Sequence, residues 1–385
     1  MTWFEKPVAL GMFALMGAVP TAATWLAPGP LEPTPEAELL DIGIEPFDPG
    51  LERKWSWAQD QERASPEVRK SEAAFLATHL MRTLQGTERF GLVRMVPSNS
   101  RTTDLRVTGK IHYSTGRRLE LKIEVVDATG RRWYKRKYKQ SAEPMSYAIR
   151  FMGTSEPFQQ LYDEIAIDLI EAQNRFDKEY LEELREIAEL RYAAELAPSI
   201  FGGYLKVDGK DRVRIERLPA RDDPILERVR RIQLHNEFFL DLLTERYQSF
   251  YDEMDETYDE YRANSYDVET ALIEAIRLYN SNARPRVSER GDFGTFDVWK
   301  ARRAEYFRRR AAAQARYLED IKLDFSSVIE PMLIELEGET IHLEGSIENQ
   351  YDQWKALLER IFESETGLSP TAEPSRAAAA ASPER

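Results

Sequence analysis

Residues 103–138 carry the clearest structural pattern in this chain of 385 residues. Apolar and polar side chains alternate through three runs, and the runs are separated by Ser114-Thr115-Gly116 and by Ala128-Thr129-Gly130. Alternation with a period of two is typical of strands that bury one face, and short turns containing glycine are typical of hairpins. The segment therefore predicts a three-stranded antiparallel meander. Such a meander supplies no catalytic group, so it favours a scaffold.

The segments on either side of the meander predict an α+β fold. Residues 39–47 alternate as a first strand, and residues 65–67 combine an N-cap serine, a proline and an acid at the start of a helix. Residues 90–96 predict a second strand, and residues 156–158 begin a helix after the meander. The order is strand, helix, strand, meander, helix. We assign this α+β domain to residues 38–172.

These motifs resemble a known domain of envelope proteins. The motifs are DIGIEPFDPG at residues 41–50, FGLVRMVPS at 90–98, the meander, and EPFQQLYDEIAIDL at 156–169. Their order resembles the small α+β domain of penicillin-binding-protein activator lipoproteins, of the curli secretion lipoprotein and of the amino-terminal part of TolB. The resemblance implies an envelope domain that binds proteins. It assigns no catalytic residue to this chain. Those activators and the curli protein are anchored through a lipidated cysteine, and this chain has no cysteine.

Residues 173–328 predict a mainly helical, partly coiled-coil domain. A charged amphipathic helix is expected over residues 171–197, and residues 201–220 alternate around an Asp-Gly turn as a β-hairpin. A long helix is expected to begin at residues 222–224, and its length without a breaker indicates a coiled-coil-like arm. A separate, shorter helix is expected over residues 267–280.

An arginine-rich helix is expected over residues 296–326, after a polar loop. The chain has room to turn back, so we expect this helix to lie beside the long helix with the aromatic residues of both in a common core. The arginines would then pair with an acidic run; binding of phosphate or lipid headgroups is the alternative. The acids are Asp252, Glu253, Asp255, Glu256, Asp259 and Glu260, and the arginines are Arg302, Arg303, Arg308, Arg309, Arg310 and Arg316.

Residues 329–368 predict a strand-strand-helix unit. Two strands are expected within residues 332–346, and a helix over residues 350–365 is expected to stop at Gly367. The unit resembles half of a BON domain, which is an envelope module. Residues 369–385 predict a disordered tail.

The N-terminus indicates where the protein acts. An uncharged apolar run over residues 7–27 precedes a proline-rich linker at residues 28–37. Thr21-Ala22-Ala23 offers small residues for signal-peptide cleavage, while a run of about 20 residues also suits an inner-membrane anchor. A buried soluble helix is a third interpretation. We expect residues 1–27 to be a signal peptide or an anchor, and the remainder to be periplasmic.

Composition and residue spacing exclude several classes of function. A net charge of -14 argues against nucleic-acid binding, and the absence of cysteine excludes disulfides, thiolate zinc sites and cysteine nucleophiles. His79, His112, His235 and His342 lack the spacing of a metal site, and His235 is expected in a core or an interface. The sequence therefore predicts no catalytic, metal-binding or cofactor-binding residue and no cofactor.

These observations favour a non-enzymatic periplasmic protein that acts as a protein-binding scaffold or accessory factor of a cell-envelope assembly. The expected partners are envelope proteins, with membrane proximity through the N-terminal segment and without nucleic acid. Their identity and the oligomeric state stay open. Two alternatives are an accessory subunit of an envelope transport or secretion machine, and an enzyme whose site is assembled only in the fold.

Overall fold

The structure is a computed structural model in which most of the chain can be described. The described residues are 39–51, 66–150, 156–209, 212–220, 222–280, scattered positions from 302 to 316, 332–336 and 339–368. The N-terminal run, the proline-rich linker and the C-terminal tail that the sequence predicts lie outside these ranges. Within them, no helix combines the length and the hydropathy that crossing a membrane requires.

A five-stranded sheet with the order β2-β1-β3-β4-β5 forms the first half of the protein. β1 (Ile42–Ile44) lies parallel to β2 (Val93–Met95) on one side and to β3 (Leu105–Ser114) on the other. β4 (Arg118–Asp127) and β5 (Arg132–Ser141) continue the sheet with antiparallel pairing. The predicted meander is therefore β3-β4-β5, and the α+β fold class is confirmed.

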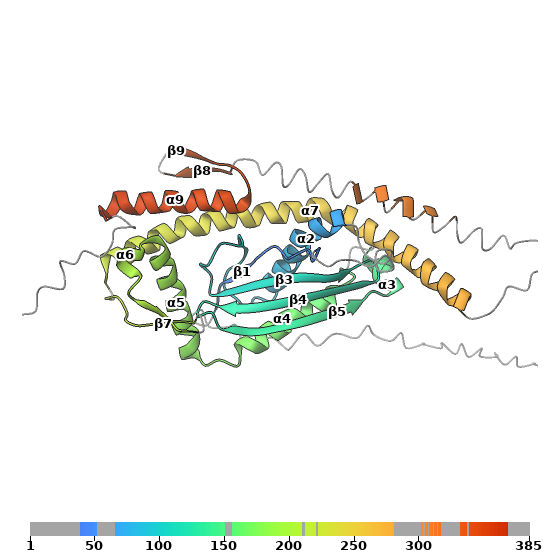
Figure 1. Ribbon diagram of the computed structural model, residues 1–385, viewed down its shortest axis with the longest axis horizontal. Helices are drawn as coiled ribbons and strands as arrows, with labels where there is room; N and C mark the ends of the chain where they lie inside the picture. Colours follow the sequence, from blue (N-terminus) through green and yellow to red (C-terminus); the bar gives the residue numbers. More distant parts are fainter. Residues whose placement is uncertain are drawn as a thin grey trace, which may run out of the picture.

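The alternation in the meander separates a buried face from an open one. The inner face packs against α2 (Pro66–Gln85) and α4 (Gln159–Gln173), which lie behind the meander in Figure 1. A short helix that the sequence did not predict, α3 (Pro144–Arg150), follows β5. The fully buried side chains of β4 on the inner face are Leu119, Leu121, Ile123 and Val125.

The expected helix over residues 171–197 is confirmed from residue 178 onward, but its predicted start was wrong because residues 171–173 belong to the preceding helix. α4 ends at Gln173, and α5 (Lys178–Leu196) begins after four intervening residues. The side chain of Asp177 accepts a hydrogen bond from the backbone N of Tyr180 at 2.9 Å and so caps α5. An aspartate at this position stabilises a new helix start more than it stabilises a helix interior.

A small hairpin follows α5 and the short helix α6 (Pro198–Phe201). β6 (Leu205–Val207) and β7 (Val213–Ile215) pair antiparallel. This confirms the hairpin that the sequence predicts within residues 201–220.

α7 (Pro224–Asn280) is one helix of 57 residues, so the prediction of a separate helix over residues 267–280 was wrong. The side chain of Asp223 caps its first turn. No glycine or proline interrupts the rest of the helix. Asn264, whose side chain can compete with helical hydrogen bonds, instead donates to the carbonyl of Glu260 at 2.7 Å within the helix.

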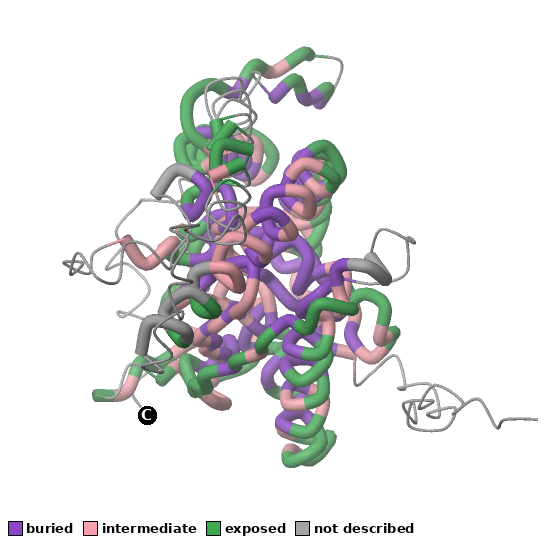
Figure 2. The backbone as a smooth tube through the Cα atoms, turned by 90° about the vertical axis from the view of Figure 1, so that its right-hand side faces the viewer, coloured by how far each residue is buried: buried purple, intermediate pink, exposed green. Residues whose placement is uncertain are grey.

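The long helix that the sequence predicts is confirmed. α7 packs against α2, α5, α9 and β2, and its C-terminal end extends past the sheet (Figure 1). The ring of Tyr251 stacks on Phe75 of α2 with centroids 4.3 Å apart. Nearer its N-terminus, Phe239 stacks on Trp354 at 5.9 Å. The buried residues gather at the centre of the described part (Figure 2), and the core includes residues of α7, α2 and the sheet.

The predicted strand-strand-helix unit is confirmed. β8 (Met332–Leu336) and β9 (Glu339–Leu343) form an antiparallel hairpin, and α9 (Ile347–Thr366) follows. Gly367 ends α9 with a positive φ of 66°, a conformation that glycine adopts at low cost. In Figure 1, α9 lies along the N-terminal half of α7.

The described residues of the arginine-rich stretch are helical, and an ion pair joins one of them to α7. Arg310 lies 3.4 Å from Glu260, as the predicted pairing of acidic and basic stretches requires. The predicted common aromatic core was wrong for Tyr306, which is 58% exposed. Trp299 and Phe307, which were expected in that core, lie outside the described residues.

Candidate functional site

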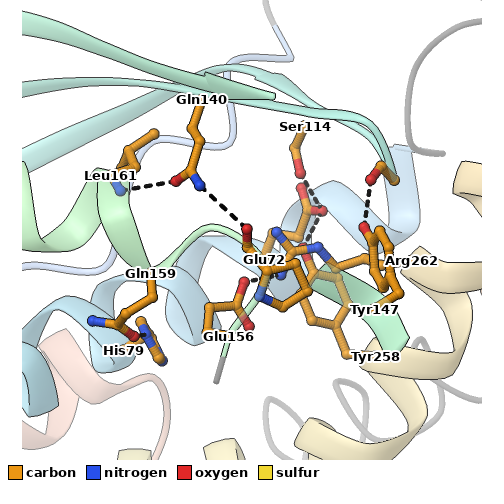
Figure 3. A network of polar contacts seen from close by, with 12 residues as sticks. Glu72, His79, Ser114, Gln140, Tyr147, Glu156, Gln159, Leu161, Tyr258 and Arg262 are labelled. Atoms are coloured by element: carbon orange, nitrogen blue, oxygen red, sulfur yellow. Dashed lines mark hydrogen bonds and ion pairs between the residues drawn. The ribbon is translucent and has the colours of Figure 1, made fainter. Parts of the chain in front are cut away.

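Two groups of polar side chains distinguish the described part of the chain. One is a buried polar network between α2, the meander and α7, shown in Figure 3. The other, which we call the outer basic face, is the side of the meander that points away from α2 and α4.

Glu72 is the centre of the first part of the buried polar network. Its side chain is 1% exposed, and its Oε1 accepts hydrogen bonds from Ser114 at 2.7 Å and from Tyr258 at 2.6 Å. Arg69, one helical turn earlier, places its Nε 3.2 Å from Oε2 of the same carboxylate. Helix α2, strand β3 and helix α7 therefore share one buried carboxylate (Figure 3).

Arg262 and Glu156 form the second part of the network. Arg262 Nη1 donates to Glu156 Oε1 at 2.5 Å, and the two side chains are 1% and 2% exposed. The guanidinium also lies over the rings of Phe158, at 4.3 Å, and Tyr258, at 4.8 Å. Burial alone would lower the pKa of Arg262, but the negative charge of Glu156 raises it well above its usual value. The guanidinium of Arg262 thus stays protonated in the folded protein.

The β3-β4 turn is pressed against the backbone of α7. A Cβ at Gly116 would lie 2.2 Å from the N of Tyr266 and 2.4 Å from the O of Arg262, so this close approach requires glycine. Glu269 of α7 accepts hydrogen bonds from Thr115 Oγ1 at 2.9 Å and from the N of Gly116 at 3.1 Å. Tyr147 of α3 also donates to the carbonyl of Gly116.

His79 joins α2 to two other helices. Its Nδ1 lies 2.8 Å from the hydroxyl of Tyr251 on α7, and its Nε2 lies 2.9 Å from Gln159 Oε1 on α4. Its side chain is 9% exposed. Both ring nitrogens therefore make hydrogen bonds that hold neighbouring helices together.

The four histidines lie in different parts of the fold. His112 is on β3, His235 is half-buried on α7, and His342 is exposed on β9. Across the described ranges, no three His, Asp or Glu side chains are arranged to hold a metal ion. In the acidic run of α7, Asp252 pairs with Arg82 of α2 at 2.7 Å.

The buried polar network holds α7 on the α+β half. Its central carboxylates and guanidinium groups are almost fully buried, so a substrate in solution has no access to them. Removing one member would leave a buried charge or hydrogen-bonding group without its partner, which costs more than the net value of the contact. We therefore assign these residues a role in fixing helix position.

The outer basic face lies on the opposite side of the meander, where Figure 1 shows no described element in front of the strands. Lys110, Lys122 and Lys137 occupy directly opposed positions on β3, β4 and β5, so three lysines form a row across the sheet. Like charges in directly opposed positions destabilise a sheet. The other basic residues at outward positions are Arg106, Arg118, Arg132, Lys135 and Lys139.

Two glutamates of β4 partly balance these positive charges. Burial raises the pKa of Glu120, but hydrogen bonds from Lys137 and Arg118 outweigh it, so the pKa lies below its usual value. Glu124 shows the same balance with Lys135 and Arg132. Both glutamates therefore stay ionised, and each already serves two cations. Glu45 and Asp48, which follow β1, pair with Arg106 and Lys110. Basic side chains still remain in excess on this face, in a protein whose net charge is -14.

A groove of about 650 Å³ lies between the start of α7 and the end of α9. Arg228 spans it and donates to Glu365 Oε2 at 2.8 Å. Arg231 and Leu368 also line the groove. The ion pair across it fastens the last turn of α9 to α7, so the groove is a helix junction.

The sequence predicted none of the residues in these two groups as a site. A signal for the buried polar network was present, because Glu72 and His79 fall three before and four after the apolar Phe75, on the same side of α2. Arg262 similarly follows Tyr258 by four residues. A charged residue on an apolar helical stripe is the pattern that indicates a buried ion pair.

Comparison with protein-family models, with curated proteins and with solved structures finds no match for this chain. Its function is therefore argued from its residues.

Proposed function

We propose that this protein is a non-enzymatic, protein-binding scaffold or accessory factor of the bacterial cell envelope, and that it acts in the periplasm. The observation that carries the proposal is the outer basic face. It is a sheet surface of three strands, each ten residues long, with no described element over it.

The charge on this face supports binding as its role. A sheet face that only needed to be soluble could carry mixed charges in alternation, which stabilises cross-strand pairs. The outward positions of β4 do alternate in charge, but Lys122 at their centre has Lys110 opposite it on one side and Lys137 on the other. An arrangement that costs folding stability is expected where a charged partner supplies the missing attraction.

The sequence of the N-terminal segment supports a location in the cell envelope. Residues 7–27 are uncharged and apolar, and the proline-rich residues 28–37 would separate a membrane or a cleavage site from the folded part. The resemblance of the motifs in residues 38–172 to envelope domains that bind proteins points in the same direction.

Two measurements test the proposal in growing bacteria. Alkaline phosphatase fused to the C-terminus should be active, because the enzyme folds only after export. A photo-crosslinking amino acid at Lys137 should give a covalent adduct with an envelope protein, which mass spectrometry would identify.

Lys178 on α5 is the matched control for the crosslinking position, because its side chain is 53% exposed against 56% for Lys137. We expect the adduct at Lys137 alone. An inactive fusion would contradict the location, and identical adducts at the two positions, or none at either, would contradict binding through the outer basic face.

A further inference from the structure

β5 is the edge strand of the five-stranded sheet. Among the described residues it pairs only with β4, so one side of its ten-residue backbone offers unpaired N–H and C=O groups. Such an edge is a ready template for another extended chain. Proteins keep an edge free of other chains with short strands, bulges, a covering element or charged side chains, especially lysines. β5 is ten residues long and has a bulge at its start, and the charges along it decide which chains it keeps away.

α4 holds β5 in place from the inner face without replacing its missing neighbour. Asp168 of α4 accepts hydrogen bonds from Arg136 Nη1 at 2.6 and 2.7 Å and from the hydroxyl of Tyr138 at 2.5 Å. Gln140 accepts from the N of Leu161 at 2.9 Å. These side chains anchor alternate residues of β5, so its backbone is already extended before any partner arrives. Preorganisation of this kind reduces the entropic cost of binding.

The residues between these anchors are lysines on the outer basic face. Lys135, Lys137 and Lys139 are exposed and occur at every second position. Lys135 and Lys137 contact Glu124 and Glu120, which are also paired with arginines. Within the described residues, Lys139 makes no ion pair.

Alternate lysines on an edge select the kind of chain that can pair with it. A second copy of β5 would bring lysine against lysine, and directly opposed like charges are destabilising. An acidic strand with carboxylates at every second residue would instead place one carboxylate beside each lysine. The same three side chains thus repel another copy of this protein and attract an acidic segment.

We propose that the edge of β5 receives an extended acidic segment of a partner protein as a sixth strand, with acidic side chains at alternate positions beside Lys135, Lys137 and Lys139. This inference rests on the proposed protein-binding function and names the chemistry of the partner. Main-chain hydrogen bonds supply the docking, and the alternation of charge supplies the register.

Fluorescence anisotropy with synthetic ten-residue peptides tests the proposal on the purified protein. The probe alternates threonine and glutamate. One control peptide has the same composition with the glutamates in adjacent pairs, and another carries N-methyl groups at every second amide along one edge. We expect the alternating peptide to bind, and each control peptide to bind about tenfold more weakly or worse.

The charge reversal Lys135→Glu, Lys137→Glu, Lys139→Glu should lower affinity for the alternating peptide by about tenfold or more. The matched control reverses three exposed cations elsewhere, Arg175→Glu, Lys178→Glu and Lys206→Glu, and should keep the affinity. Circular dichroism would verify that both variants are folded. If the N-methylated peptide binds as tightly as the alternating peptide, binding by strand addition is refuted. If both triple variants lose affinity equally, the assignment of the site to β5 is refuted.

Two further results separate this inference from the function on which it rests. Crosslinks from Lys137 to an envelope protein without peptide binding would refute the acidic strand but keep the binding function. Self-association of the protein that disappears on reversal of the β5 lysines would also refute the acidic strand, with a second copy as the occupant.

Discussion

Substitution of Glu156 by glutamine tests the buried polar network most directly. The change preserves the shape of the side chain and removes its charge, so the guanidinium of Arg262 stays in a site that is 1% exposed without a counter-ion. Arginine cannot escape this cost by losing its proton. Breaking a buried ion pair on one side costs about 3 to 5 kcal/mol, a large part of a typical unfolding free energy of about 5 to 15 kcal/mol.

Urea denaturation followed by circular dichroism would measure this cost. The control is Glu260→Gln, the same substitution in an arginine-glutamate pair whose side chains are 47% and 40% exposed. We expect the control to lose about 0 to 1 kcal/mol. Combining Glu156→Gln with Arg262→Met should recover part of the loss, because neither buried charge then remains. If the losses of unfolding free energy in Glu156→Gln and in its control differ by less than about 1 kcal/mol, the pair does not hold α7 in place as described.

Three further predictions concern the sheet, its pH dependence and the docking of α9. Leu121→Asp should unfold the sheet, because a buried unpaired carboxylate costs several kcal/mol, whereas Lys122→Asp on the outer face should keep or raise the melting temperature; similar losses in both variants would contradict the assigned faces. Burial raises the pKa of Asp104 from 3.8 to about 7, so its contribution to stability is present below about pH 4 and is lost as the pH rises through about 7. The urea midpoint should therefore change less between about pH 5 and about pH 8 in Asp104→Asn than in the wild type. An equal change in both proteins would exclude the Asp104 carboxyl as a source of the pH dependence. Trp354→Ala should cost about 3 to 5 kcal/mol, because the indole is fully buried against Phe239; a loss below about 1 kcal/mol in urea denaturation would contradict the packing of α9 on α7.

The parts of the fold that the sequence predicts correctly depend on local signals. The meander and the strand-strand-helix unit follow from a period of two, from glycine turns and from helix caps, all of which act within a few residues. Gly367, for example, ends α9 where a glycine stop was expected. The boundary between α4 and α5 is also local, and Asp177 could have identified it as a helix cap.

The parts that were missed depend on which distant segments meet. The parallel pairing of β1 between β2 and β3 joins residues about fifty or sixty positions apart, and no periodicity specifies it. The aromatic stripe of α7 was expected to face the arginine-rich stretch, but Tyr251 packs on Phe75 of α2. An apolar stripe shows that a helix is buried and does not show against which partner.

The outer basic face could be predicted only in part for the same reason. The lysines at positions 135, 137 and 139 are visible in the sequence as alternate residues of a strand. Alternation assigns them to one face, but the position of α4 decides which face is covered. Arg136, which interrupts them, falls on the opposite face by the same alternation, and there it pairs with Asp168 of α4.

The position of α7 late in the chain has a consequence for synthesis. α2 has left the ribosome long before Tyr251, Tyr258 and Arg262 are made, by roughly 10 to 40 s at a rate of ~5–20 residues per second. During this interval Phe75 has no aromatic cover from α7, and the carboxylate of Glu72 lacks its tyrosine donor. The incomplete chain is therefore the form most exposed to aggregation and to proteolysis. A substitution in α7 that slows its docking can lower the yield of the protein even when the finished molecule is fully stable.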